Sequence, residues 1–151
     1  MPSMIWSNLN PLQLGKYAEY YAKMEFTSYG YDVYTSEVDD HGVDFVIKNG
    51  AGDFCEVQVK SVLKSKYVFI PKDKISLDER HIVCLLRFAD GKLPDVYIVP
   101  TTVWLEPNDV FVVRNYGKPG QKSKPECGIN ITKKALPLLG PYRADNFFNR
   151  D

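Results

Sequence analysis

Cysteine, net charge and long apolar runs are all scarce in this 151-residue chain. The three cysteines, Cys55, Cys84 and Cys127, lie far apart and show none of the paired spacing that zinc sites use, so we interpret them as reduced structural residues. No run approaches the roughly 18 apolar residues that would span a bilayer, and no basic start followed by an apolar stretch indicates an export signal. We therefore expect a soluble, cytoplasmic protein.

The length and composition are those of one globular domain. A chain of this size buries roughly 70% of the surface of its unfolded form, which is enough for a core without disulfides or structural metals. The hydrophobic fraction of 44% and the charged fraction of 25% are ordinary values for folded proteins. We expect a single domain over residues 1–151.

The net charge of zero conceals an uneven distribution. Residues 1–113 hold 11 basic and 16 acidic residues, whereas residues 114–151 hold eight basic and three acidic residues, which gives charges of −5 and +5. Such a stretch is either a solvated loop or a surface that faces phosphate groups. The lysines that we consider candidates for nucleic-acid contact are Lys118, Lys122, Lys124, Lys133 and Lys134.

Apolar periodicity predicts one long helix followed by many short strands. Apolar residues recur at helical spacing from Leu12 to Tyr29, and Gly30 stands where a helix C-cap is expected. Runs rich in β-branched and aromatic residues predict strands at 31–35, 43–48, 54–62, 67–70, 81–88, 95–100, 110–113 and 127–131. A helical turn is expected at 101–105, and a second helix from Thr132 to Pro137 or Gly140. This order predicts an α/β or α+β fold, in which a helix precedes a central mixed sheet with flanking helices.

The stretch from Asp53 to Ser61, DFCEVQVKS, alternates strictly between apolar and polar residues. A turn at 50–52 would pair positions whose numbers sum to 102, which places Asp44 opposite Gln58. The polar residues Asp44, Glu56, Gln58 and Lys60 would then share one face, because strand side chains alternate. A register slipped by one residue would put Phe45 beside Gln58 and Lys60, so we prefer the first register.

A further carboxylate is expected from the first helix. Glu19 lies about 140° from the centre of the apolar arc on a helical wheel, near its border, whereas Glu25 lies at about 20°. Clustered carboxylates repel by roughly 4 kcal/mol at 4 Å and an effective dielectric near 20, which Lys60 offsets in part and a divalent cation offsets further. Oxygen ligands of this kind suit Mg²⁺ or Mn²⁺.

The segments GKYAEYYAKMEFTSYGYDV, DDHGVDFVI and EVQVKS together resemble the PD-(D/E)xK nuclease superfamily, in its Holliday-junction-resolvase-like and restriction-endonuclease-like branch. The resemblance covers about residues 12–62. Glu19, Asp44, Gln58 and Lys60 fit the family's catalytic positions in order. Val43 replaces the proline of the motif, and Gln58 replaces its acidic residue.

The resemblance implies a restriction-endonuclease-like core and a metal-dependent endonuclease that hydrolyses DNA, with Mg (or Mn) as the cofactor. Asp44 and Gln58, with Glu56 as a possible substitute for the missing acid, would hold the metal. Lys60 would act on the attacking water, and Glu19 would position a second ion or a water. Relatives often act as homodimers. The alternatives are a catalytically inactive module that binds nucleic acid or a protein partner, and a toxin, immunity or mobile-element component that uses the fold for interaction alone.

Overall fold

The computed structural model describes residues 1–38 and 41–149, which include all of the candidate site residues. The chain begins with a short 3-10 turn, η1 (Trp6–Asn8), and the long helix α1 (Pro11–Ser28). Asn10 and Gln13 close the N-terminus of α1 with a reciprocal capping box, and Pro11 occupies the first turn, where its missing N–H needs no partner. Gly30 adopts a φ of +87° directly after the helix, as expected for a residue that ends it.

In the described part of the chain, eight strands follow, and they form two sheets. The central sheet has the order β1-β2-β3-β5-β6 and the smaller sheet the order β4-β8-β7. The central strands are β1 (Asp32–Tyr34), β2 (Phe45–Lys48), β3 (Phe54–Val62), β5 (His81–Arg87) and β6 (Asp95–Pro100). The strands of the smaller sheet are β4 (Tyr67–Pro71), β7 (Phe111–Arg114) and β8 (Glu126–Asn130). The α+β class and the predicted strand positions are therefore confirmed, whereas the division into two sheets was not predicted.

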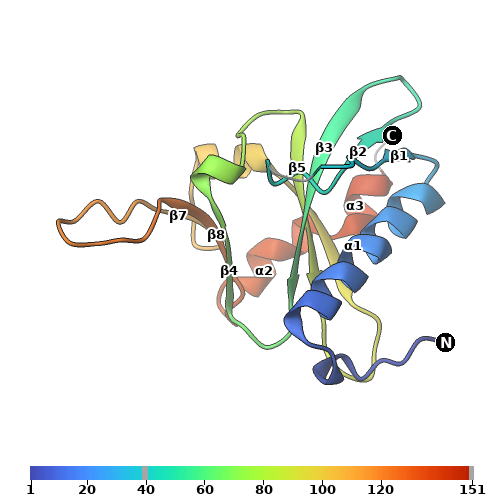
Figure 1. Cartoon of the computed structure of the whole chain (residues 1–151), viewed down its shortest axis with the longest axis horizontal. Coiled ribbons are helices and arrows are strands. Elements are labelled where there is room, and N and C mark those ends of the chain that lie inside the picture. Colours follow the sequence, from blue (N-terminus) through green and yellow to red (C-terminus); the bar gives the residue numbers. More distant parts are fainter. Residues whose placement is uncertain (39–40, 150–151) are drawn as a thin grey trace.

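Strands β3 and β5 run parallel, and the other neighbouring strands described in both sheets are antiparallel. The chain crosses from β3 to β5 by way of β4 and the turn η2 (Lys72–Lys74), which belong to the other layer. This crossover makes the central sheet mixed. It also covers one face of the sheet with β4, β7 and β8, while α1 lies on the opposite face (Figure 1).

Two hydrophobic cores result, one on each face of the central sheet. The first packs α1 against inward residues of the β2–β3 hairpin and β5. Phe26 of α1, Phe45 of β2 and Val57 of β3 belong to this core and have no exposed surface. The second packs Val83 and Leu85 of β5 against the smaller sheet and Trp104, which lies in the turn η3 (Thr101–Leu105). Alternate residues of β5 thus serve different cores, as the period of a strand requires.

The predicted second helix is shorter than expected. The backbone turns at Thr132, whose carbonyl accepts bonds from the N–H groups of Ala135 and Leu136, but α2 covers only Leu136–Leu139. The predicted start at Thr132 was wrong. Proline is favoured in the first turn of a helix and not in its interior, and Pro137 accordingly lies in the first turn of α2. A turn η4 (Gly140–Tyr142) and a helix α3 (Ala144–Phe148) follow, and Phe148 packs against Phe26 of α1.

The segment between β7 and β8 extends away from the body of the protein (Figure 1). We call residues 115–125 the arm. At its base the Lys72 ammonium donates to the Asn115 side-chain oxygen at 2.8 Å, and Lys124 contacts Asp73 at 3.1 Å. The described chain contains no helix that combines the length and the apolar character needed to cross a membrane.

Candidate active site at the open edge of β3

The predicted register of the β2–β3 hairpin is confirmed. Phe45 pairs with Val57, Val46 with Glu56 and Ile47 with Cys55, so paired numbers sum to 102. The turn between the strands is closed by Asn49, whose side-chain oxygen accepts bonds from the N–H groups of Ala51 and Asp53. Phe45, Ile47 and Val57 are buried under α1, and the alternate residues Glu56, Gln58 and Lys60 belong to the other face.

Asp44 directly precedes Phe45, the first residue of β2. Strand β2 pairs with β3 only as far as Val57, so the edge of β3 is open beyond that residue. The N–H of Asp44 donates to the Val57 carbonyl at 2.9 Å, and its carboxylate accepts the N–H of Val59 at 2.6 Å. These two bonds bracket Gln58, which agrees with the expected neighbourhood of Asp44 and Gln58. The carboxylate therefore lies along the edge of the sheet and replaces the backbone acceptor that a longer β2 would have supplied.

Lys60 follows on the same strand and is close enough to Asp44 for the two charges to interact. Burial of Lys60 lowers the pKa of its ammonium group below the ordinary value, and the negative charge of Asp44 opposes this effect. A desolvated lysine beside a carboxylate is a recognised arrangement for acid–base work, because its proton is released more easily than that of a solvated lysine. Sequence reasoning placed these two groups together, and the structure does so as well.

A cavity of about 630 Å³ adjoins this edge of the sheet, and we call it the upper cavity. Gln58 and Glu56 of β3 line it, together with Gly42 and His81, whereas Asp44 and Lys60 are not in its lining. Gly42 has a φ of +80°, and a Cβ there would lie 2.7 Å from the Lys74 carbonyl oxygen and 3.3 Å from the Gln58 amide nitrogen. Glycine is thus required for this wall, because a side chain would displace both neighbours.

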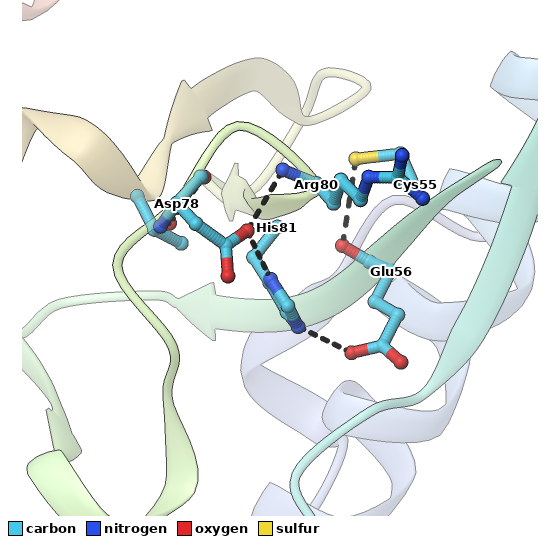
Figure 2. A network of polar contacts seen from close by, with 6 residues as sticks. Cys55, Glu56, Asp78, Arg80 and His81 are labelled. Carbon is cyan, nitrogen blue, oxygen red and sulfur yellow. Dashed lines mark hydrogen bonds and ion pairs between the residues drawn. The ribbon is translucent and has the colours of Figure 1, made fainter. Parts of the chain in front are cut away.

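Glu56 takes part in a contact that sequence reasoning missed. Its carboxylate lies 2.5 Å from Nε2 of His81, and Nδ1 of the same ring lies 2.6 Å from the Asp78 carboxylate (Figure 2). Because carboxylates only accept, the protonated ring can donate to both of them. The bond from His81 is also the main cause of the lowered pKa of Asp78. Glu56 and His81 meet because they are directly paired in the parallel strands β3 and β5. The sequence alone does not show that these two strands are neighbours, so it could not predict this contact.

The structure distinguishes between the two helical acids. Glu19 contacts Lys16 at 3.3 Å and Lys23 at 3.1 Å, and Asp44 is one of the charges that raise the pKa of Lys16. Glu19 therefore belongs to a cluster of charges on α1 whose Lys16 is also attracted by Asp44. Glu25 lies elsewhere: burial and the charge of Asp145 raise the pKa of its carboxyl group.

The donor set resembles a magnesium site with reduced charge. Carboxylate and amide oxygens are ligands that Mg²⁺ accepts, and Mg²⁺ often takes only one or two protein carboxylates and keeps several waters. Among residues 1–38 and 41–149, however, no group of three His, Cys, Asp or Glu side chains is arranged to hold a metal ion. A cation here would depend on Asp44, on the neutral oxygen of Gln58 and on oxygens from water or substrate.

The candidate lysines for nucleic-acid contact fall on two surfaces rather than one. Lys118, Lys122 and Lys124 belong to the arm, whereas Lys133 and Lys134 lie beyond β8. Lys124 pairs with Asp73, and Lys134 makes a long contact of 3.9 Å with Asp109. Within the described part of the chain, Lys118, Lys122 and Lys133 form no ion pair.

Comparison with known proteins gives structural neighbours but no sequence relatives. No family model and no curated protein sequence matches the chain. The fold is similar to that of Hjc, a Holliday junction resolvase from Archaeoglobus fulgidus, an archaeal hyperthermophile, with a TM-score of 0.54 and 13% identity over 91% of this chain and 97% of the resolvase. It is also similar to I-Ssp6803I, a bacterial homing endonuclease, with a TM-score of 0.52 and 18% identity over 90% of this chain and 88% of the endonuclease. The helix, the mixed sheet and these two neighbours together show that the chain has a restriction-endonuclease-like fold.

Proposed function

We propose that this protein is a metal-dependent endonuclease that hydrolyses phosphodiester bonds in DNA. The observation that carries the proposal is that the carboxylate of Asp44 acts electrostatically on the desolvated Lys60 at the open edge of β3, within a restriction-endonuclease-like fold. The similarity to a resolvase and to a homing endonuclease supports the reaction class, and the basic surfaces support an anionic polymer as substrate.

The oxygens of Asp44 and Gln58 would hold Mg²⁺ or Mn²⁺, with Glu56 as a third candidate ligand if its carboxylate leaves His81. When bound, the cation polarises a phosphoryl oxygen and lowers the pKa of a water. Lys60 would orient that water or take its proton, and would stabilise the negative charge that develops on the phosphate. Glu19 forms ion pairs with Lys16 and Lys23. Its proposed role is to position an outer water or a second ion.

The test of the proposal is nicking of supercoiled plasmid DNA. We expect conversion to open circles with Mg²⁺ or Mn²⁺ and no conversion in EDTA. A correctly folded preparation that leaves the plasmid intact over a range of both metals would contradict the proposal. It would favour the second candidate, an inactive nucleic-acid-binding module, which the neutral Gln58 at the acidic position of the motif supports.

Restoring a carboxylate at position 58 should strengthen metal binding. Gln58→Glu has nearly the same shape and adds a negative charge beside Asp44, so the concentration of Mn²⁺ needed for half-maximal effect should fall about tenfold, equivalent to roughly 1.4 kcal/mol. Isothermal titration with Mn²⁺ measures this directly. The matched variant Glu56→Gln removes a charge from the neighbouring position on the same strand. If Gln58→Glu left the affinity unchanged, position 58 would not belong to the metal site.

Neutralising the arm should weaken DNA binding without affecting the fold. In the triple variant Lys118→Gln, Lys122→Gln and Lys124→Gln, three charges are lost from a segment that extends into solvent, so we expect the slope of log K against log salt to fall by up to about 2.7. Fluorescence anisotropy with a labelled duplex at several salt concentrations measures the slope. An unaltered slope would show that the arm is only a solvated loop.

A further inference from the structure

A second cavity, which we call the basic hollow, lies at the opposite end of the polar face of β3. Its volume is about 510 Å³, and its basic lining residues are Lys64, Lys66, Arg87, Lys133 and Lys134. Val62 lines it as well and pairs with Arg87 of β5. Lys60 precedes Val62 by two residues and so belongs to the same face of the strand. The hollow therefore begins about 7 Å along the strand from Lys60.

The walls of the basic hollow are fixed by backbone hydrogen bonds. The N–H of Ile131 donates to the Lys66 carbonyl at 2.7 Å, which joins the turn after β3 to the segment after β8. The N–H of Phe88 donates to the Val62 carbonyl at 2.8 Å and fixes the end of β5. Three segments far apart in the sequence thus bring their basic residues together in one stable recess.

The charge of the basic hollow is poorly compensated within the protein. The described lining includes no aspartate or glutamate. Arg87 lies 4.0 Å from Asp95 and Lys134 lies 3.9 Å from Asp109, distances at the limit of an ion pair. Within the described chain, Lys64, Lys66 and Lys133 form no ion pair. Five cations around one recess repel one another, so this arrangement favours an anionic ligand.

The chemistry of the recess favours a polymer backbone over a free nucleotide. The two hydroxyl groups of the lining are engaged in local turns: Ser65 donates to the Tyr67 carbonyl and Thr132 accepts from the Ala135 N–H. Specific recognition of a base or sugar needs several directed hydrogen-bond donors and acceptors, whereas binding of a phosphodiester backbone needs chiefly positive charge. The ammonium groups provide that charge.

We infer that the basic hollow binds the phosphate groups of a DNA strand on the side of Lys60 opposite the upper cavity. This inference rests on the proposed function for the identity of the anion, but not on catalysis. The strand would pass along the open edge of β3, with Lys60 between the two cavities. Lys64, Lys66 and Arg87 thereby become DNA-contact residues in addition to Lys133 and Lys134.

The experiment compares two double variants of equal charge. Lys66→Gln with Lys133→Gln removes two charges from the hollow, and Lys48→Gln with Arg80→Gln removes two charges at the other end of the β2–β3–β5 sheet. Binding of a fluorescein-labelled 20-base-pair duplex is measured by anisotropy in EDTA, so that cleavage does not enter. The hollow variant should bind about tenfold more weakly and lose about 1.8 from the salt slope, and the control should lose less than half as much.

Equal losses in the two variants would overturn the inference, because they would show a response to net charge alone. A second arm tests free anions: thermal unfolding is recorded with ATP and with inorganic phosphate. Loss of ATP stabilisation in the hollow variant with unchanged DNA binding would also overturn it, since the site would then serve a free anion. Binding is measured without metal, so the two proposals can fail separately. If the protein did not nick DNA but its DNA binding still depended on the basic hollow, only the proposed function would be refuted.

Discussion

Lys60→Met is expected to reduce plasmid nicking at least about 100-fold while raising the melting temperature. The loss follows because Lys60 is the basic side chain that we propose to act on the attacking water and the scissile phosphate, and removal of one such group typically costs this much. The gain follows because desolvation outweighs the attraction of Asp44 for the Lys60 ammonium. Methionine fills a similar volume without carrying a charge into the protein.

The lowered pKa of Lys60 also predicts the direction in which the stability of the wild type changes with pH. An unfolded lysine keeps its proton up to a pH of about 10.4, whereas the lowered pKa of Lys60 means that the native protein releases the proton earlier. The native state then binds fewer protons in the window between the two pKa values, so stability rises with pH across that window. In thermal unfolding between pH 7 and 10.5, the wild type should therefore gain stability relative to Lys60→Met as the pH rises, because groups with raised pKa values such as Cys55 act equally in both proteins. Lys48→Met is the matched control.

Arginine at position 60 separates two roles of the lysine. Lys60→Arg keeps a positive charge, but its guanidinium group cannot give up its proton near neutral pH. If Lys60 takes a proton from water, Lys60→Arg should be as inactive as Lys60→Met. If Lys60 only stabilises negative charge, Lys60→Arg should be more active than Lys60→Met. We expect it to remain inactive, because the lowered pKa of Lys60 favours proton transfer. Nicking by Lys60→Met at the wild-type rate would remove Lys60 from the mechanism altogether.

Substitutions of Asp44 should separate its structural role from its role toward metal. Asp44→Asn retains an oxygen that can accept the Val59 N–H, so we expect a folded protein with a melting temperature within a few degrees of the wild type. The negative charge is lost, and nicking should fall at least about 100-fold because a neutral amide binds Mg²⁺ poorly. Circular dichroism and plasmid nicking together check both parts.

Asp44→Ala should lose activity and stability together. It leaves the Val59 N–H at the open edge of β3 without its acceptor, which costs about 1–3 kcal/mol of unfolding free energy. Denaturant unfolding of the two variants measures the difference between them. If Asp44→Asn cleaved DNA like the wild type, the carboxylate would be only a cap for the strand edge, and the metal site would lie elsewhere.

The local parts of this fold could be predicted from the sequence, because they depend on neighbouring residues. The helix over 12–29, the turn at Asn49 and the register that brings Asp44 to Gln58 all follow from periodicity and turn chemistry. The pairing of β3 with β5 depends on a crossover through the smaller sheet, which no local pattern encodes. For this reason the contact between Glu56 and His81 and the position of Lys64 and Lys66 beside Lys133 became visible only in the structure.

The short turn that joins β2 to β3 has a consequence for the order of assembly. Asp44 and Lys60 belong to one hairpin closed by local bonds, whereas the basic hollow needs the turn after β3, the end of β5 and the segment after β8 to meet. Local contacts form before distant ones, because closing a longer loop costs more chain entropy. Pulse-labelling hydrogen exchange during refolding should therefore show protection of the Val59 amide before that of the Ile131 amide. The proposed catalytic residues would then be assembled before the basic hollow that we infer to bind DNA.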